Sequence, residues 1–422
     1  MQGQPELHVR GPSFAVASMS RRRFLAHAGT GAAAVGLAGF LAACTGDQPT
    51  QASDVFAGDP QGEVVFANWP IYIDKAKDEN GKAYIPSLRR FTDRTGIDVE
   101  YLEVIQDTAS FFAKIQPQLA AGDPTGYDIF MAAGRQLSIE IARGWLIPLG
   151  DGERPNFDAN AAAWAKDPPW DPGNTYSMPW QGGFTGLAVN HKLLPNGIRT
   201  FDDLADPEKV GRARVGMIKT EMPEFVMINL GIDVATSGPA EWKEAAAWLT
   251  KQREAGVVRA YYEDGYIDDL VNANLAATMA WSGDVFYYGT WAGYPELEFD
   301  FPPDGGAIWW ADNMVIPQGA EHPVDALALM DYYYDPVPAT MVAEWVLYMS
   351  PVSGVQDRIR RDAEKASEQG YKGYAGKLEI TAENPFLFPD EATLARTQPL
   401  KEITSDDELN EWNAIFGPIS QS

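Results

Sequence analysis

The sequence predicts an α/β protein built of two lobes, and three observations lead to this prediction. The chain has 422 residues, which is more than one ordinary hydrophobic core accommodates. Strand and helix patterns alternate over residues 62–149, as in an α/β unit. Two later stretches, 176–190 and 278–317, are strand-like and are separated by a further set of helices. We therefore expect these two stretches to cross between two lobes.

The first part of the chain shows each pattern in turn. Apolar runs and alternating positions predict strands, whereas apolar residues three or four positions apart predict helices. Gly96 is expected to end the first helix, because glycine readily takes the backbone conformation that follows a helix. The expected strands are 63–68, 97–104 and 127–132, and the expected helices are 87–95, 109–121 and 137–143.

The second part contains both crossings. The first, 176–190, is expected to be a strand broken by Pro179, Gly182 and Gly183, and 278–317 is expected to return. The other expected elements are a strand at 214–218, helices at 223–230, 240–255, 268–274, 324–334 and 339–347, and a mostly helical, acidic tail from 351 with a loop at 384–389. The expected lobes are 62–180 with 285–345, and 181–284 with 346–422.

Residues 1–43 have the composition of an export signal. Ser20 begins the sequence SRRRFL, which is similar to a twin-arginine signature, and a Gly/Ala-rich apolar run follows. The run ends in LAAC, which resembles a lipoprotein box, so Cys44 is expected to be lipidated. The alternative is that Cys44 is a buried core residue. Residues 44–61 are polar and are expected to form a flexible tether. We thus expect a protein anchored by lipid to the outer face of the membrane, or periplasmic.

Composition and missing motifs argue against several classes of function. The formal net charge of −26 disfavours nucleic acid and anionic membrane surfaces and mildly favours cations, although plain solubility explains it equally well. The sequence lacks a P-loop, GxSxG, HExxH and a GxGxxG that follows a strand. With one Cys and four His, no tight zinc site, metal or cofactor is expected.

Two acids beside aromatic residues are the candidate binding groups. Asp284 follows Trp281, and Asp312 follows Trp309 and Trp310, each after a short apolar run. A carboxylate next to an indole suits an organic cation, because the carboxylate accepts charge-assisted hydrogen bonds and the ring face attracts the cation. The alternative is a buried pair of strands whose ends are capped by acids.

Taken together, several stretches resemble the bacterial spermidine/putrescine-binding proteins of ABC importers over about residues 62–355. The matching stretches are NWPIY (68–72), FTDRTGIDVEY (91–101), YDIFMA (127–132), GWLIPL (144–149), FTGLAVN (184–190), AWSGDVF (280–286) and DGGAIWWADNMVIP (304–317). The resemblance implies a two-lobe periplasmic-binding-protein fold of type II, with the ligand in a cleft between the lobes. It also implies a membrane permease powered by an ATPase as partner. We expect a monomer that is not an enzyme.

The resemblance also implies which residues bind the ligand. Carboxylates would hold the amines and aromatic rings would enclose the polymethylene chain. Glu221 and Glu224 fit an acidic pair at a helix start, although helix-dipole complementarity explains them as well. The residues carried over are Trp69, Tyr72, Glu221, Glu224, Trp281, Asp284, Trp310, Asp312 and Tyr348.

Two departures from the family pattern leave the ligand open. Pro70-Ile71 stand where many relatives carry a hydroxyl and a polar or acidic residue, and Ala133 and Arg135 stand where relatives often have Ser and Tyr. If Arg135 faces the cleft, it would favour a shorter diamine or an amine that also bears a carboxylate. Otherwise it is a surface arginine. An exported hydrolase and a structural envelope lipoprotein are the alternatives from other classes.

Overall fold

The structure is a computed structural model that describes residues 55–150, 152–403 and 405–420, without the side chain of Arg135. The predicted signal, 1–43, and the lipidation residue Cys44 lie outside the described residues. Within the described part, no helix combines the length and the apolar character needed to cross a membrane.

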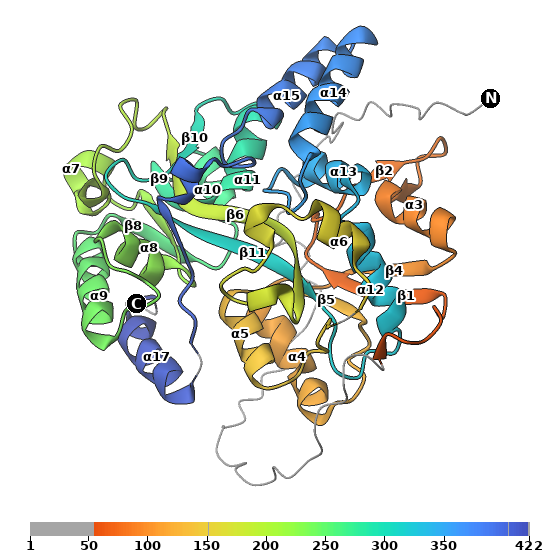
Figure 1. The fold of residues 1–422 in the computed structure, drawn as a ribbon. Coiled ribbons are helices and arrows are strands. Elements are labelled where there is room, and N and C mark those ends of the chain that lie inside the picture. Colours follow the sequence, from red (N-terminus) through yellow and green to blue (C-terminus); the bar gives the residue numbers. More distant parts are fainter. Residues whose placement is uncertain (1–54, 151, 404, 421–422) are drawn as a thin grey trace.

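One mixed sheet extends through both halves of the molecule (Figure 1). Its strand order is β4–β1–β5–β11–β6–β9–β7–β8, with β10 paired to β6 and β12 to β11. The outer three strands at each end are parallel to one another, and β6 and β11 are antiparallel in the middle. The strands are β1 (Glu63–Asn68), β4 (Asp98–Glu103), β5 (Ile129–Ala133), β6 (Ser177–Asn190), β7 (Val215–Ile218), β8 (Val258–Tyr262), β9 (Ala277–Trp281), β10 (Leu297–Asp300), β11 (Ala307–Val315) and β12 (Thr397–Pro399). A separate hairpin joins β2 (Ala76–Lys77) to β3 (Ala83–Tyr84).

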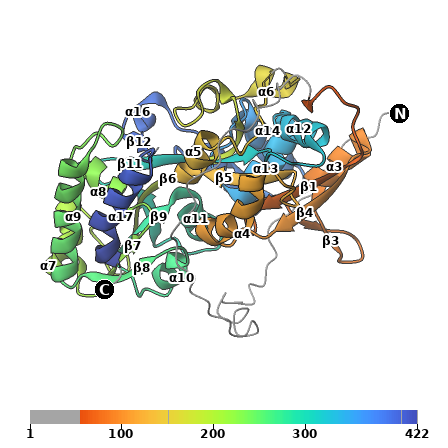
Figure 2. The same ribbon diagram turned by 90° about the horizontal axis from the view of Figure 1, so that it is seen from below.

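Helices surround the sheet in two groups, each packed on its own hydrophobic core (Figures 1 and 2). The first group comprises α3 (Pro86–Thr95), α4 (Thr108–Ala121), α5 (Gly134–Ala142), α6 (Pro155–Asn160), α12 (Pro323–Tyr332), α13 (Pro336–Val346), α14 (Val355–Glu368) and α15 (Lys372–Ala382). The second comprises α7 (Pro207–Val210), α8 (Met222–Asn229), α9 (Pro239–Glu254), α10 (Tyr266–Val271), α11 (Ser282–Phe286), α16 (Glu391–Leu394) and α17 (Asp406–Ser420). Each helix predicted between residues 87 and 347 therefore has a counterpart.

The first crossing is continuous, and the predicted break in it was wrong. All fourteen residues of β6 are buried. Pro179 does not interrupt the ladder, because the register with β11 shifts beside it, between Asp312 and Asn313. Gly182 does not break the strand either. A Cβ there would lie 2.7 Å from Met349 Cε and 3.0 Å from Trp164 Cη2, so glycine permits close packing.

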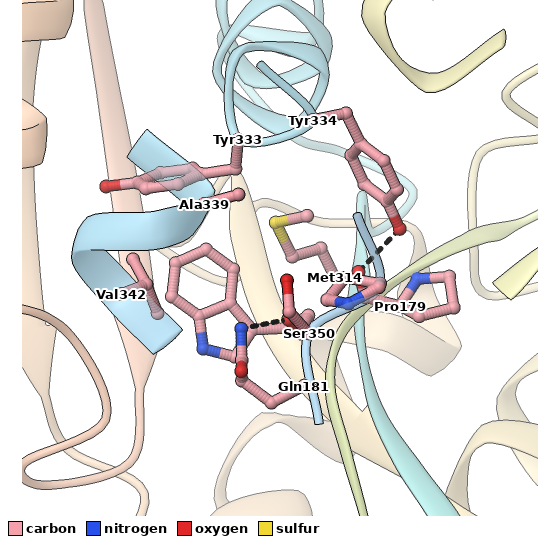
Figure 3. Close-up of a pocket in the computed structure, with 10 residues that line it drawn as sticks. Pro179, Gln181, Met314, Tyr333, Tyr334, Ala339, Val342 and Ser350 are labelled. Atoms are coloured by element: carbon pink, nitrogen blue, oxygen red, sulfur yellow. Dashed lines mark hydrogen bonds between the residues drawn. The ribbon is translucent and has the colours of Figure 1, made fainter. Parts of the chain in front are cut away.

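A third segment lies beside β6. The backbone groups of Gly182 and Met349 exchange two hydrogen bonds of 2.8 Å, which attach residues 349–351 to β6. A small cavity lies behind this junction, between Gln181, Ser350 and Met314, and is closed from above by Tyr333 and Tyr334 (Figure 3). Its volume of about 10 Å³ is close to the space of one water molecule.

The packing differs from the predicted lobe boundaries in two segments. Leu297, Phe299 and Ala307 were expected in the first lobe, yet they belong to the core of the second group. Conversely, Ile359 of α14 and Leu378 of α15 were expected in the second lobe and belong to the first core. The reason is that the chain changes lobes within β11 and again between α15 and α16, and periodicity does not reveal where these changes happen.

The folded part begins before Gly62, in contrast to the predicted tether. Val55 and Phe56 pack against the first core. The backbone N–H groups of Gln61 and Gly62 donate to Asp325 Oδ2, both at 2.9 Å, and Glu63 N–H donates at 3.3 Å. Asp325 is fully buried in the first turn of α12, where the helix dipole favours a negative charge. The rest of the predicted tether, 44–54, lies outside the described residues.

We predict that Asp325→Ala will lower the free energy of unfolding by about 2–4 kcal/mol, because three backbone donors would lose a charged acceptor. Urea denaturation measures this change. Asp93→Ala, at an exposed position of α3, is the matched control and should shift stability by less than about 0.5 kcal/mol. Equal stability of the two variants would contradict the role assigned to Asp325.

Candidate functional site

Asp312 lies at the centre of the sheet. It was expected at the end of an apolar run, but β11 continues past it to Val315. Asp312 pairs in register with Ala133 of β5 on one side and with Gln181 of β6 on the other. The hydroxyl of Tyr72 donates to Asp312 Oδ2 at 2.8 Å. A predicted aromatic residue and a predicted acid, 240 positions apart in the chain, therefore meet at the crossing.

Asp284 lies in the first turn of α11, directly after β9, and does not end the strand as expected. Two tyrosine hydroxyls donate to its carboxylate, Tyr348 at 2.8 Å and Tyr266 at 3.0 Å. Tyr266 in turn accepts a hydrogen bond of 2.8 Å from the backbone N–H of Trp281. Tyr348 was predicted as a binding residue, whereas Tyr266 was not.

Glu221 is linked by hydrogen bonds to two of the three predicted tryptophans. It precedes α8, and its Oε1 accepts from Trp281 Nε1 at 3.1 Å. Its Oε2 accepts from the hydroxyl of Thr185 on β6. That hydroxyl accepts from Trp310 Nε1 at 3.0 Å. The indoles of Trp281 and Trp310 are therefore oriented by one carboxylate and one threonine.

The aromatic rings contact one another across the crossing strands. Tyr348 lies between Tyr72 and Trp310, with ring centroids 5.9 and 5.6 Å away, and Tyr266 and Trp281 are 5.6 Å apart. Trp281 and Trp310 pack against both hydrophobic cores. A change in the distance between the lobes would therefore alter the packing of these two indoles.

Two glycines make room for Tyr348. A Cβ on Gly183 would lie 2.7 Å from Trp310 Cζ2 and 3.1 Å from Tyr348 Cδ1. A Cβ on Gly283 would lie 2.6 Å from Tyr348 Cζ. The tyrosine ring therefore packs directly on the backbone beside Asp284, and larger residues at either position would displace it.

The site is strongly acidic. Burial raises the pKa of Asp312 to about 7; the hydrogen bond from Tyr72 lowers it, and the nearby negative charge of Glu221 raises it further. Burial, and then the charge of the carboxylate that each one faces, raises the pKa of Tyr72, Tyr266 and Tyr348. These three hydroxyls consequently remain protonated and act as donors. Hydrogen bonds from neutral hydroxyls do not neutralise an ionised carboxylate, and a cation beside Asp312 would favour its ionised form, so a cationic ligand would be favoured here.

The remaining predicted residues have different environments. Trp69 is half-buried against the first core. Glu224 is fully buried in the first turn of α8. The backbone of Arg135 lies in α5, and its side chain is outside the described part, so its position relative to the acids stays a prediction. Among the described residues, no group of three or more His, Cys, Asp or Glu is arranged to hold a metal ion.

Two lobes joined by crossing strands, with acids and aromatic rings gathered at the crossing, define a solute-binding protein. The profile of the bacterial extracellular solute-binding proteins matches residues 87–373, and the chain belongs to this family.

Named relatives have similar sequences. The chain is 26% identical to the spermidine/putrescine-binding periplasmic protein of Escherichia coli over 294 residues, which cover 69% of this chain and 78% of that protein. It is 27% identical to the putrescine/cadaverine-binding protein of Pseudomonas aeruginosa over 353 residues, which cover 81% of this chain and 89% of the relative.

A solved structure confirms the fold class. The spermidine/putrescine ABC transporter substrate-binding protein of Streptococcus pneumoniae superposes with a TM-score of 0.67 at 21% identity, covering 85% of this chain and 98% of that one. The predicted two-lobe type II periplasmic-binding-protein fold, with lobes joined by crossing strands, is therefore confirmed. The ligand cleft between the lobes stays a prediction.

We predict that Asp312→Asn will change how stability depends on pH. The raised pKa means that folded wild type binds a proton more tightly than the unfolded chain, whose Asp pKa is about 3.9. The free energy of unfolding of wild type therefore falls as pH rises through about 4 to 7. The variant lacks this loss, so its stability relative to wild type should rise by about 1–3 kcal/mol between pH 5 and pH 8.

Urea denaturation at several pH values measures this difference, with Asp93→Asn as the surface control. If the wild-type and Asp312→Asn curves run parallel from pH 5 to pH 8, the assignment of the titration to Asp312 is contradicted.

Proposed function

We propose that the chain is the substrate-binding component of an ABC importer and that its ligand is a small polyamine of the putrescine or spermidine kind. The named relatives bind putrescine, cadaverine or spermidine, and their sequences match this chain over most of its length. The fold is one whose lobes close on a ligand by a hinge motion. These points support a binding protein and not an enzyme.

The single observation that carries the proposal is the cluster of acids and rings at the crossing strands. Asp312, Asp284 and Glu221 accept hydrogen bonds from Tyr72, from Tyr348 and from Trp281 respectively. Each ionised carboxylate has about four acceptor sites, so an ammonium group can bind beside the tyrosine hydroxyls. The ring faces would cover the methylene chain between two ammonium groups and add cation–π attraction.

The acids come from different parts of the fold, which suits a ligand with two charges. Tyr72 lies in the first core, and Asp312 lies on the crossing strand β11. Asp284 lies in the first turn of α11 and Glu221 directly precedes α8, both in the second group of helices. A diamine that contacts both sets would stabilise the closed arrangement of the lobes. Its binding free energy then supplies the preference for the closed form.

The expected partners follow from the same proposal. The closed form would dock on a membrane permease driven by a cytoplasmic ATPase. The chain would act as an exported monomer, with the twin-arginine signal and the lipid on Cys44 as the proposed route and anchor. Glu224 and Arg135 stay proposed contributors to ligand selection, by adding or opposing negative charge at the site.

A thermal-shift screen tests the function. The ligands are putrescine, cadaverine, spermidine, amino acids with a side-chain amine, and quaternary amines. At a ligand concentration of about 100 times Kd, stabilisation should be about 2.7 kcal/mol. A response to the diamines supports the proposal. A response only to amines that also carry a carboxylate would show that the ligand is an amino-acid-like compound and not a polyamine. No response to any amine would contradict the proposed function.

We predict that Asp284→Asn will weaken putrescine binding by about 2–4 kcal/mol, because an ammonium group would lose a charged acceptor in a partly buried site. Titration calorimetry measures the change. Asp93→Asn removes an acid of the same type from an exposed position of α3 and should bind like wild type. Unchanged affinity of Asp284→Asn would remove this residue from the site.

A further inference from the structure

The turn that carries two of the site residues has an unfavourable residue at its third position. Trp69, Pro70, Ile71 and Tyr72 connect the end of β1 to the following loop. Ile71 has a φ of +65°, and its side chain is 67% exposed. Proline at the second position and a positive φ at the third are features of a type II turn, in which glycine or asparagine is preferred third. A β-branched residue there is a conformational outlier, of the kind that functional sites retain.

Two side chains hold this turn in place. The backbone N–H of Ile71 donates to Glu103 Oε1 at 2.6 Å. Lys75 Nζ donates to both carboxylate oxygens of Glu103, at 2.6 and 2.7 Å. Glu103 ends β4 and is in register with Asn68, which ends β1, so the acceptor is mounted on the sheet directly beside the turn.

The other side of the turn leads into the site. The carbonyl of Tyr72 accepts from Trp180 Nε1 of β6 at 3.1 Å, and the Tyr72 hydroxyl reaches Asp312. The conformation of Ile71 sets the direction in which the chain enters Tyr72. A change in φ at Ile71 would therefore move the Tyr72 ring relative to both Asp312 and Tyr348.

We propose that Glu103 is a positioning residue that holds the Pro70-Ile71 turn in its unfavourable conformation and so fixes Tyr72 against Asp312. Lys75 neutralises Glu103, so Glu103 acts through the turn and not as a further ligand for an amine. The proposal deepens the proposed function and rests on it, since the consequence of a misplaced Tyr72 is weaker ligand binding. The sequence pointed to Pro70-Ile71 as a departure from the family pattern but not to Glu103, because it does not show that residue 103 meets residue 71.

The test combines Glu103→Ala with Ile71→Gly. Glu103→Ala should weaken putrescine binding about five- to thirtyfold. This factor corresponds to the free-energy cost of the left-handed conformation at Ile71, which Glu103 would no longer offset. Glycine takes positive φ without that cost, so Ile71→Gly alone should bind like wild type. The double variant should recover to within about threefold of wild type. Glu103→Gln keeps an acceptor for the Ile71 N–H and should show a smaller loss than Glu103→Ala.

A matched control removes the corresponding half of another ion pair. Glu296 pairs with Lys192 in the second lobe, and Glu296→Ala should leave the affinity unchanged. Two results would overturn the proposal. Wild-type affinity of Glu103→Ala would show that the turn needs no support. A loss in Glu103→Ala that Ile71→Gly does not relieve would show that Glu103 contacts the ligand itself.

A measurement without ligand separates this proposal from the proposed function. Thermal unfolding of the unliganded proteins should show a midpoint lowered by a few degrees in Glu103→Ala and restored in the double variant. If wild type binds no amine while this pattern holds, the function fails and the positioning role stands. If wild type binds putrescine and the unliganded midpoints of all variants are equal, the positioning role fails and the function stands.

Discussion

Three carboxylates gather where the central strands cross, and the candidate site is built around them. Asp312 lies in the middle of β11 between two neighbouring strands, and Glu221 is close enough to raise its pKa further. Tyrosine hydroxyls and an indole N–H satisfy the carboxylates as hydrogen-bond acceptors without cancelling their charge. In the folded protein the buried carboxylates therefore retain an unfavourable electrostatic free energy, which a bound cation would lower. In a structural ion pair, by contrast, a cationic side chain of the protein already provides this compensation.

The fold provides this arrangement through close backbone packing at the crossing. Gly182 and Gly183 let Met349, Trp310 and Tyr348 approach β6, and Trp281 and Trp310 pack on both cores. Two of the side chains proposed to bind the ligand, Trp281 and Trp310, thus also pack between the lobes. Under the proposed function, ligand binding and the relative position of the lobes would be coupled because both depend on these contacts.

Local patterns in the sequence were sufficient for most of the helices and strands. The strand 63–68 coincides with β1, and Gly96 ends α3 with a φ of +76°, as expected. The resemblance to known binding proteins pointed to the candidate site, and the structure brings these residues together: the acids at 284 and 312 and the rings at 72, 281, 310 and 348. What periodicity could not show was long-range pairing. Tyr266 reaches Asp284, and Glu103 reaches Ile71, through contacts between distant segments.

Two errors have the same origin. The tether was expected to extend to residue 61 because its composition is polar, yet two apolar residues, Val55 and Phe56, find places on the first core. The first crossing was expected to be broken because proline and glycine usually interrupt strands, yet a register shift accommodates Pro179 and neighbouring rings require Gly183. In both cases tertiary packing decides what local propensity leaves open.

The number of protons released when putrescine binds shows whether the ammonium group lies beside Asp312. Calorimetry in two buffers of different ionisation enthalpy gives this number. Asp312 is about half protonated at pH 7 in the unliganded protein, and an ammonium group beside it would lower its pKa, so binding should release about half a proton at pH 7 and almost none at pH 8.5. Asp312→Asn should abolish the release at pH 7. Tight binding by wild type with no proton release at pH 7, or with proton uptake, would contradict the account.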